Sequence, residues 1–145
     1  MAEISLRRAR TIIRKALEAG QAQQMRPLSV VVLDAGGHVK AFERQDGASP
    51  GRFGIAHGKA YGAVMLHMSG TALAERVAAG PGGAAFVAAA NGVFGGAVVP
   101  VPGGVLVRDG KGHVIGAVGV SGDLSERDAA AAVAGIEASG LSAEA

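Results

Sequence analysis

The chain has 145 residues and no cysteine, so it is long enough to bury a core but has no disulfide, thiol nucleophile or cysteine-ligated metal. Hydrophobic residues make up 49% and charged residues 18%, which predicts one globular domain over residues 1–145. A net charge of +2 and only 3% aromatic residues exclude the basic, aromatic-lined surface of a nucleic-acid-binding protein.

The N-terminal segment MAEISLRRARTIIRKAL carries basic residues but lacks the uninterrupted apolar run of a signal peptide. No stretch reaches the roughly 18 apolar residues that a membrane span needs. We therefore expect a cytoplasmic protein without a membrane or nucleic-acid partner, and we interpret the basic residues of this segment as a solvated helix face.

The first element is an amphipathic helix from about Ser5 to Gln24, because apolar residues recur there at spacings of three and four. Ser5 is its expected N-cap and Pro27 follows its end. Two β-hairpins are predicted next, at residues 28–44 and, much later, at 104–122. Both contain the pattern Asp-x-x-Gly-His-Val, which we interpret as similar turn chemistry.

Helices are predicted between and after the hairpins. Ser49 and Pro50 form an expected N-cap and first-turn pair for a helix that runs to about His67. Shorter helices follow at 71–79 and 84–91, separated by a break at 81–83, and the segment 92–104 is either an irregular loop or an edge strand.

The last helix should begin at a capping box, 125-SERD-128, and run to about Ser139, where Gly140 stops it. Ser125 is the expected cap and Asp128 the third helical residue. The order helix, hairpin, helices, hairpin, helix predicts an α+β domain with four or five antiparallel strands flanked by helices.

A polar cluster is expected where the first hairpin leads into the second helix. Arg44 and Asp46 end a strand, and Arg52 and Lys59 add cationic donors to a helix start that favours anions. Ser121 and Asp123 fall nearby if the two hairpins lie side by side. The cluster therefore predicts a carboxylate-binding site, and the alternative is that Asp46 and Ser49 only tie down the turn while Arg52 and Lys59 are solvated.

Histidines offer a second chemistry. His57 and Tyr61 lie four residues apart on one helix face, while His67 is roughly 80° further round. His57 or His67 is a possible axial ligand of haem, and a surface or packing role is the alternative for each. We expect His38 and His113, which follow glycine, to be exposed turn residues.

Two stretches, 42-FERQDGASPGRFGIAHGKAYGAV-64 and 103-GGVLVRDGKGHVIGAVGVSGDLSERDAAAAVAGI-136, resemble signatures of the GlcG/HbpS-like family, which is related to the C-terminal domain of PduO-type proteins. The resemblance extends from the first helix to the last. The positions that match the family pattern are Asp46, Gly47, Ala48, Lys59, Ala60, Gly104, Gly116, Gly119, Ser121, Gly122 and Asp128. It implies a profilin-like α/β/α fold with a sheet of about five strands.

The resemblance also implies a homo-oligomer, a tetramer to octamer, and haem or another tetrapyrrole as the ligand of some members. His57 and Tyr61 are not part of the signature, and the sequence has few aromatic residues to enclose a porphyrin. The apolar segment 84–104 independently predicts association between copies, because it is too apolar to face water.

Two functions follow from these observations, and a structural oligomer without a ligand is a third alternative. The first is a protein that binds haem, another tetrapyrrole or an anionic carboxylate ligand, with Arg44, Asp46, Arg52, Tyr61 and Ser121 as ligand-binding residues. The second is a cofactor-free isomerase, lyase or hydrolase acting on a small hydroxy, keto or aromatic acid. In that enzyme His57 or Lys59 would be the general base.

Overall fold

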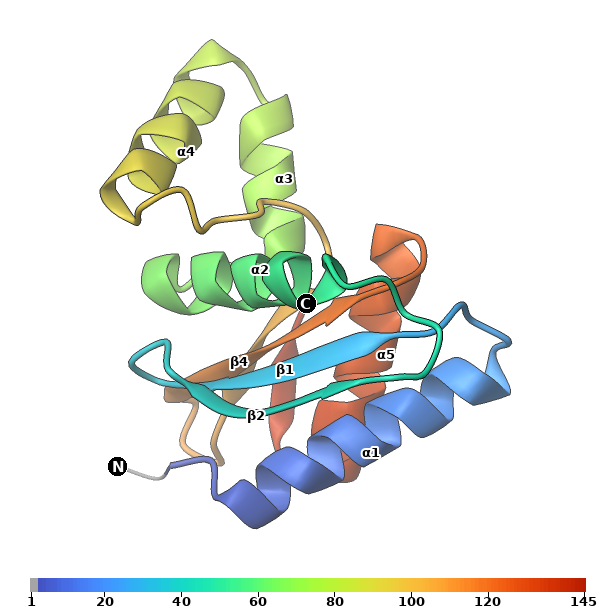
Figure 1. Ribbon diagram of the computed structural model, residues 1–145. Helices are drawn as coiled ribbons and strands as arrows, with labels where there is room; N and C mark the ends of the chain where they lie inside the picture. The colour runs from blue at the N-terminus through green and yellow to red at the C-terminus, as the bar shows by residue number, and fades with distance from the viewer. Residues whose placement is uncertain (1–2) are drawn as a thin grey trace.

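The structure is a computed structural model and describes residues 3–145, in which five helices and five strands follow one another (Figure 1). Their bounds are α1 Leu6–Ala22, β1 Ser29–Asp34, β2 Val39–Arg44, α2 Arg52–Leu66, α3 Gly70–Ala78, α4 Pro81–Val93, β3 Gly104–Arg108, β4 Val114–Ser121, α5 Ser125–Ala138 and β5 Ser142–Glu144.

The strands form one sheet in the order β2-β1-β4-β3-β5, and every neighbouring pair is antiparallel. The predicted hairpins are β1–β2 and β3–β4, and they meet side by side through β1 and β4. This confirms the α+β class and the antiparallel sheet. The short edge strand β5 was not predicted, because its three residues, Ser-Ala-Glu, carry no apolar alternation.

Helices cover both faces of the sheet: α1 and α5 lie on one face and α2 on the other (Figure 1). The strand β1 is buried on both sides, because Val30 and Val32 pack toward α1 and α5 while Val31 and Leu33 pack toward α2. Two apolar clusters therefore share this strand, which explains its continuous β-branched sequence.

Glycines let α2 lie close to the sheet. A Cβ at Gly119 of β4 would overlap the backbone carbonyl of Ala56, and one at Gly104 of β3 would overlap that of Lys59. Any side chain at these positions would push the helix away. The family-pattern glycines of the second hairpin thus have a packing role.

Two predicted helix starts are wrong. Ser5 caps α1 as expected, accepting a hydrogen bond from the backbone N–H of Arg8. Ser49 does not cap α2: the chain turns once more, and the helix begins at Arg52 after Gly51, with no side-chain cap. Likewise Ser125 is not a cap, because α5 begins at Ser125 itself and Leu124 holds the cap position.

The region between α2 and β3 is more helical than predicted. Ser69 caps α3, and Pro81 begins α4 instead of breaking the chain, since proline is well suited to the first helical position. The segment after α4 up to Gly103 is irregular, as one of the two alternatives foresaw. Together α3 and α4 form an arm that projects from the α2 side of the body (Figure 1).

Candidate functional site

A row of aromatic side chains runs along one edge of α2. Four consecutive ring contacts connect it, with centroids 4.7, 5.8, 5.5 and 6.0 Å apart. We call this row the aromatic stripe; its members in order are Phe42, Phe53, His57, Tyr61 and Phe94. Three of them belong to α2 at spacings of four residues, which places them on one helix face.

His57 is the one titratable ring within this stripe whose protonation changes near neutral pH. It is half-buried between Phe53 and Tyr61, and its ring lies nearly parallel to that of Tyr61, at 19°. Burial lowers the pKa of His57 below its usual 6.5. Among residues 3–145 its nitrogens have no hydrogen-bond partner, so the neutral imidazole is free to bind a ligand.

A second polar group lies at the start of α2. Arg52 donates a hydrogen bond from Nη1 to the Oγ of Ser121 over 3.1 Å, which brings together two of the residues expected to share a site. Arg44 is further away, because β1 separates β2 from β4. With strands about 4.8 Å apart, Arg44 and Ser121 are roughly 10 Å from each other. Ser29 of β1 fills the place between them.

The two predicted aspartates flank the segment 25–27. Asp46 is exposed and lines a hollow beside Met25 and Pro27. Asp123 accepts backbone hydrogen bonds from Arg26 at 2.9 Å and Leu124 at 2.7 Å, which lower its pKa below 3.8. Asp123 therefore stays ionised at neutral pH and ties the end of α1 to the start of α5.

Lys59 lies in the interior. Its Nζ is 3.1 Å from the Oδ2 of Asp128 and donates to the carbonyl of Val120 at 3.0 Å, and the Lys59 side chain is 3% exposed. Burial lowers the pKa of Lys59 and raises that of Asp128, while each charge offsets part of the penalty of the other. The other carboxylate oxygen of Asp128 accepts from the N–H of Asp123.

The remaining histidines lie outside the aromatic stripe. His67 follows α2 as an exposed residue with a positive φ of 51°. His38 and His113 are exposed turn residues, as predicted, and in each turn the carboxylate of an aspartate, Asp34 or Asp109, accepts a hydrogen bond from the backbone N–H of the histidine. Within residues 3–145 no three His, Asp or Glu side chains gather as a metal-binding group.

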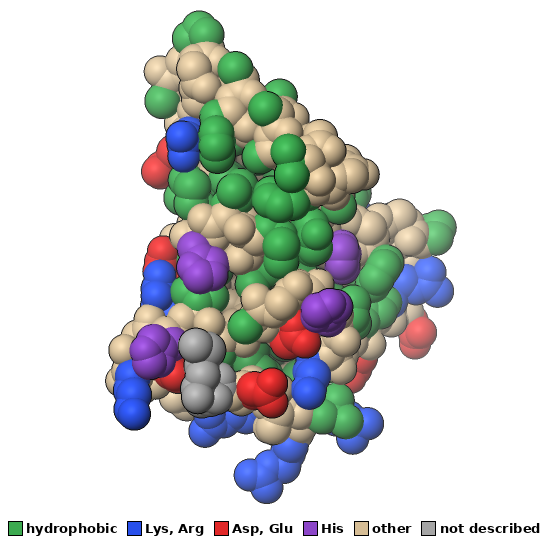
Figure 2. Space-filling model, turned by 90° about the vertical axis from the view of Figure 1, so that its left-hand side faces the viewer, with side chains coloured by type: hydrophobic (Ala, Val, Ile, Leu, Met, Phe, Trp, Pro, Cys, Tyr) green, Lys and Arg blue, Asp and Glu red, His purple; other side chains and the backbone are tan. Residues whose placement is uncertain are grey.

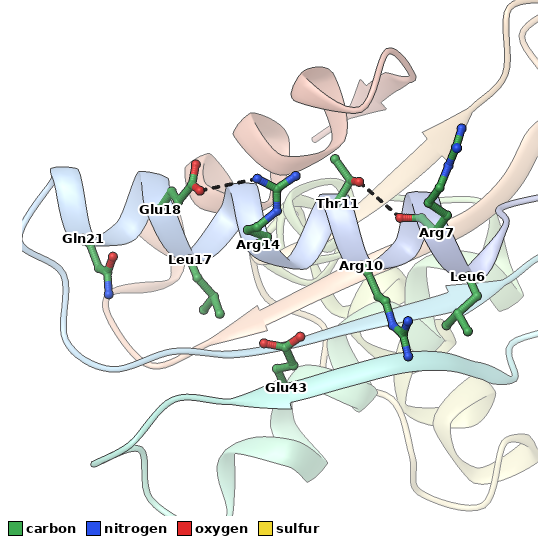
Figure 3. A pocket seen from close by; sticks show the side chains of 9 residues that line it. All are labelled: Leu6, Arg7, Arg10, Thr11, Arg14, Leu17, Glu18, Gln21 and Glu43. Atoms are coloured by element: carbon green, nitrogen blue, oxygen red, sulfur yellow. Dashed lines mark hydrogen bonds and ion pairs between the residues drawn. The ribbon is translucent and has the colours of Figure 1, made fainter.

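A groove of about 700 Å³ runs between α1 and β2 (Figure 3). Arg10 points from α1 toward β2, and Glu43 rises from β2 toward α1. Arg7 and Arg14 also line the groove, but their guanidinium groups point away from β2. The apolar side chains that line the groove are those of Leu6 and Leu17. None of the residues that line the groove is a histidine, and we keep the interpretation of these arginines as a solvated face.

The comparisons with known proteins agree with this architecture. The family model for haem-degrading, HbpS-like proteins matches residues 4–137. The chain belongs to the HbpS-like family. No curated protein matches its sequence, and within residues 3–145 no helix has the length and apolar character to cross a membrane.

Three solved structures are similar to this chain. The PduOC–haem complex is 27% identical, with a TM-score of 0.86, covering 99% of this chain and 100% of that one. A double mutant of HbpS from Streptomyces reticuli is 29% identical, with a TM-score of 0.77 and coverage of 94% and 87%. The protein ORFY of Klebsiella pneumoniae, 23% identical with a TM-score of 0.85 and coverage of 97% and 93%, shares the fold.

Most family-pattern positions of this HbpS-like chain contribute to packing. Lys59 and Asp128 form the buried ion pair, and a Cβ at Gly116 or Gly122 would overlap backbone of the neighbouring strand or of Pro27. The sequence did not point to Phe42, Phe53, Phe94 or Ser29, because their meeting depends on strand register and on the course of the loop after α4. In the sequence, the four-residue spacing of Phe53 and His57 indicates that these two side chains share a helix face.

Proposed function

We propose that this HbpS-like protein binds haem on the aromatic stripe, with His57 as an axial ligand. The observation that carries the proposal is His57 itself: a half-buried, neutral imidazole without a hydrogen-bond partner among residues 3–145, between two aromatic rings. Neutral imidazole is the form that ligates iron. The PduOC–haem complex supports the ligand class, since its fold and length match this chain.

The side chains around His57 fit such a ligand. Phe53 is 40% exposed, and Tyr61 and Phe94 extend the apolar surface to the other side. Haem also carries two propionates; Arg44 follows Phe42 by two residues in β2, and Arg52 precedes Phe53 in α2. An arginine fork suits a carboxylate. When bound, haem would supply an iron centre, and these residues would orient it and limit its contact with water.

A second copy of the chain would cover the parts that one protomer leaves open. Residues 77–107 contain no charged side chain, yet Phe86 is 40% and Val93 80% exposed. In Figure 2, hydrophobic side chains cover much of the projecting arm and continue onto the body, whereas most charged side chains lie on the lower half. Such a surface supports a homo-oligomer held by α3 and α4.

The alternative, a cofactor-free enzyme on a small carboxylic acid, keeps His57 as its candidate general base. Lys59 fits that role poorly, because its ammonium is bonded to Asp128 and Val120 and is shielded from solvent. A base must reach the proton that it abstracts. Turnover that survives His57→Gln and Lys59→Met would exclude both residues.

A haemin titration followed in the Soret band tests the proposed function. We expect saturable binding by the wild type, loss of at least tenfold in affinity in His57→Ala, and no change in His67→Ala. His67 is the matched control, because it ends the same helix but is exposed and outside the stripe. A weak band that neither substitution alters would mean that haem only adheres to apolar surface.

A further inference from the structure

Three strands place a row of polar side chains beneath the start of α2. Ser29 of β1 lies opposite Arg44 of β2 on one side and opposite Ser121 of β4 on the other. Directly opposite residues project from the same face of a sheet. Val31 and Leu33 are two and four residues after Ser29 in β1, so they project from the same face as Ser29. Both pack toward α2. The row therefore faces α2.

The Ser29 hydroxyl in this row is buried and has no partner. Ser29 is 0% exposed, and its Oγ makes no hydrogen bond within residues 3–145. Buried hydroxyls are normally bonded, because an unpaired polar group in the interior is unfavourable. The equally buried Ser121 next to it accepts from Arg52. The Cβ atoms of directly opposite residues such as Ser29 and Ser121 are about 5 Å apart. Because Arg52 bonds Ser121, a single oxygen atom can bond both the Ser29 hydroxyl and the Arg52 guanidinium.

The first turn of α2 adds further donors at the same place. Gly51 holds the cap position without a side chain, and the first turn contains no acidic residue. Within the described part of the chain, the N–H groups of Phe53 and Gly54 have no acceptor. Space beside Gly54 is open, and the N-terminal end of a 15-residue helix favours an anion.

We infer that a carboxylate binds at the start of α2, with one oxygen between Ser29 and Arg52 and the other near the N–H groups of Phe53 and Gly54. The half-buried Arg52 side chain, which donates to Ser121, would turn its guanidinium to bond the anion as well. The exposed ring of Phe53 favours an acid with an apolar or aromatic body. The carboxylate can belong to a free small acid or to a propionate of haem; only the second source rests on the proposed function.

Amide NMR of the labelled protein titrated with sodium benzoate and sodium acetate tests the free-acid source. We expect saturable shifts at Phe53 and Gly54, with benzoate binding more tightly. Ser29→Ala and Arg52→Gln should each weaken benzoate about tenfold, the effect of losing one hydrogen bond to a charged group. Ser49→Ala is the control, because Ser49 is exposed and contributes only its backbone carbonyl near this turn.

Ser29→Ala removes only an unpaired hydroxyl, so the variant should fold, which a thermal melt checks. Benzoate affinity unchanged in Ser29→Ala, or no saturable shift at Phe53 and Gly54, would overturn the free-acid site and leave Ser29 as the partner of a buried water.

Haemin and its dimethyl ester separate the two sources. If a propionate occupies the site, Ser29→Ala weakens haemin but not the ester, which has no free carboxylate, whereas His57→Ala weakens both. If neither porphyrin binds but benzoate does, the proposed function fails and the carboxylate site stands. If haemin and the ester lose the same affinity in Ser29→Ala, the propionate source is wrong.

Discussion

Lys59 and Asp128 form a 3.1 Å ion pair although their helices, α2 and α5, lie on opposite faces of the sheet. The pair meets beside Val120 of β4. The first residue of β3, Gly104, pairs with Gly119, so β3 does not extend as far as Val120. A Cβ at Gly103, just before β3, would fall 2.8 Å from the Lys59 Nζ. The late start of β3 and this glycine therefore give Lys59 a passage from one helical layer to the other.

A double-mutant cycle measures this pair. Lys59→Met leaves the Asp128 carboxylate buried without its cation, and we expect it to lower the free energy of unfolding by about 3–5 kcal/mol. Adding Asp128→Asn should restore part of the loss, because the amide oxygen can still accept from the N–H of Asp123. Urea denaturation provides the four free energies. Strictly additive effects would contradict a coupled interior pair.

Asp123 predicts a pH dependence of stability. The hydrogen bonds from Arg26 and Leu124 hold its folded pKa below 3.8, so the unfolded chain binds the proton more tightly. Its stabilisation is complete above that value and is lost as the pH falls through the folded pKa. The wild type should therefore exceed Asp123→Asn in stability at about pH 6 and approach it near about pH 2.

Asp46→Asn is the matched control for that series. Asp46 is exposed and makes no hydrogen bond with residues 3–145. Its difference from the wild type should stay near zero at both pH values. An equal loss in both variants would point to net charge as the cause.

Much of this fold could be predicted from the sequence, because hydrophobic periodicity marks α1, acidic first-turn residues and a stopping glycine mark α5, and two turn patterns mark the hairpins. The pairing of His57 with Tyr61 followed from their spacing, and the structure confirms it. The N-cap prediction at Ser49 failed because a capping residue type does not reveal how many turn residues precede a helix.

The candidate site was harder to predict because its parts come from separate elements. Lys59 resembled a surface donor, since the sequence does not show that the sheet ends early enough to let it reach Asp128. Ser29 opens an apolar strand, and only the register reveals that it lies between Arg44 and Ser121. Loops that bring distant residues together are where sequence patterns carry least information.

The projecting arm predicts the oligomeric state. We expect light scattering to give a mass well above the 14.3 kDa of one chain, corresponding to a tetramer to octamer. Val93→Glu should dissociate it, because a charge at the exposed end of α4 would be desolvated in the interface. Leu124→Glu, at an equally apolar exposed position before α5, should leave the mass unchanged. A 14.3 kDa particle for the wild type at micromolar concentration would refute the prediction.

Haem affinity should depend on pH through His57. Because burial lowers its pKa below 6.5, the imidazole is neutral at pH 7 and above, and haemin affinity should be constant there. Affinity should fall once the pH drops below the lowered pKa, since the proton then competes with iron. Haemin titrations at several pH values check this, and an affinity that rises on acidification would contradict His57 as the ligand.

The most direct test of the account changes the identity of the axial ligand. Haem-loaded His57→Cys, reduced and exposed to carbon monoxide, should show the long-wavelength Soret band of thiolate-ligated haem, and His67→Cys should keep the wild-type spectrum. That result would establish His57 on the aromatic stripe as the iron ligand. A wild-type spectrum from His57→Cys, with haem still bound, would place the iron elsewhere on the molecule.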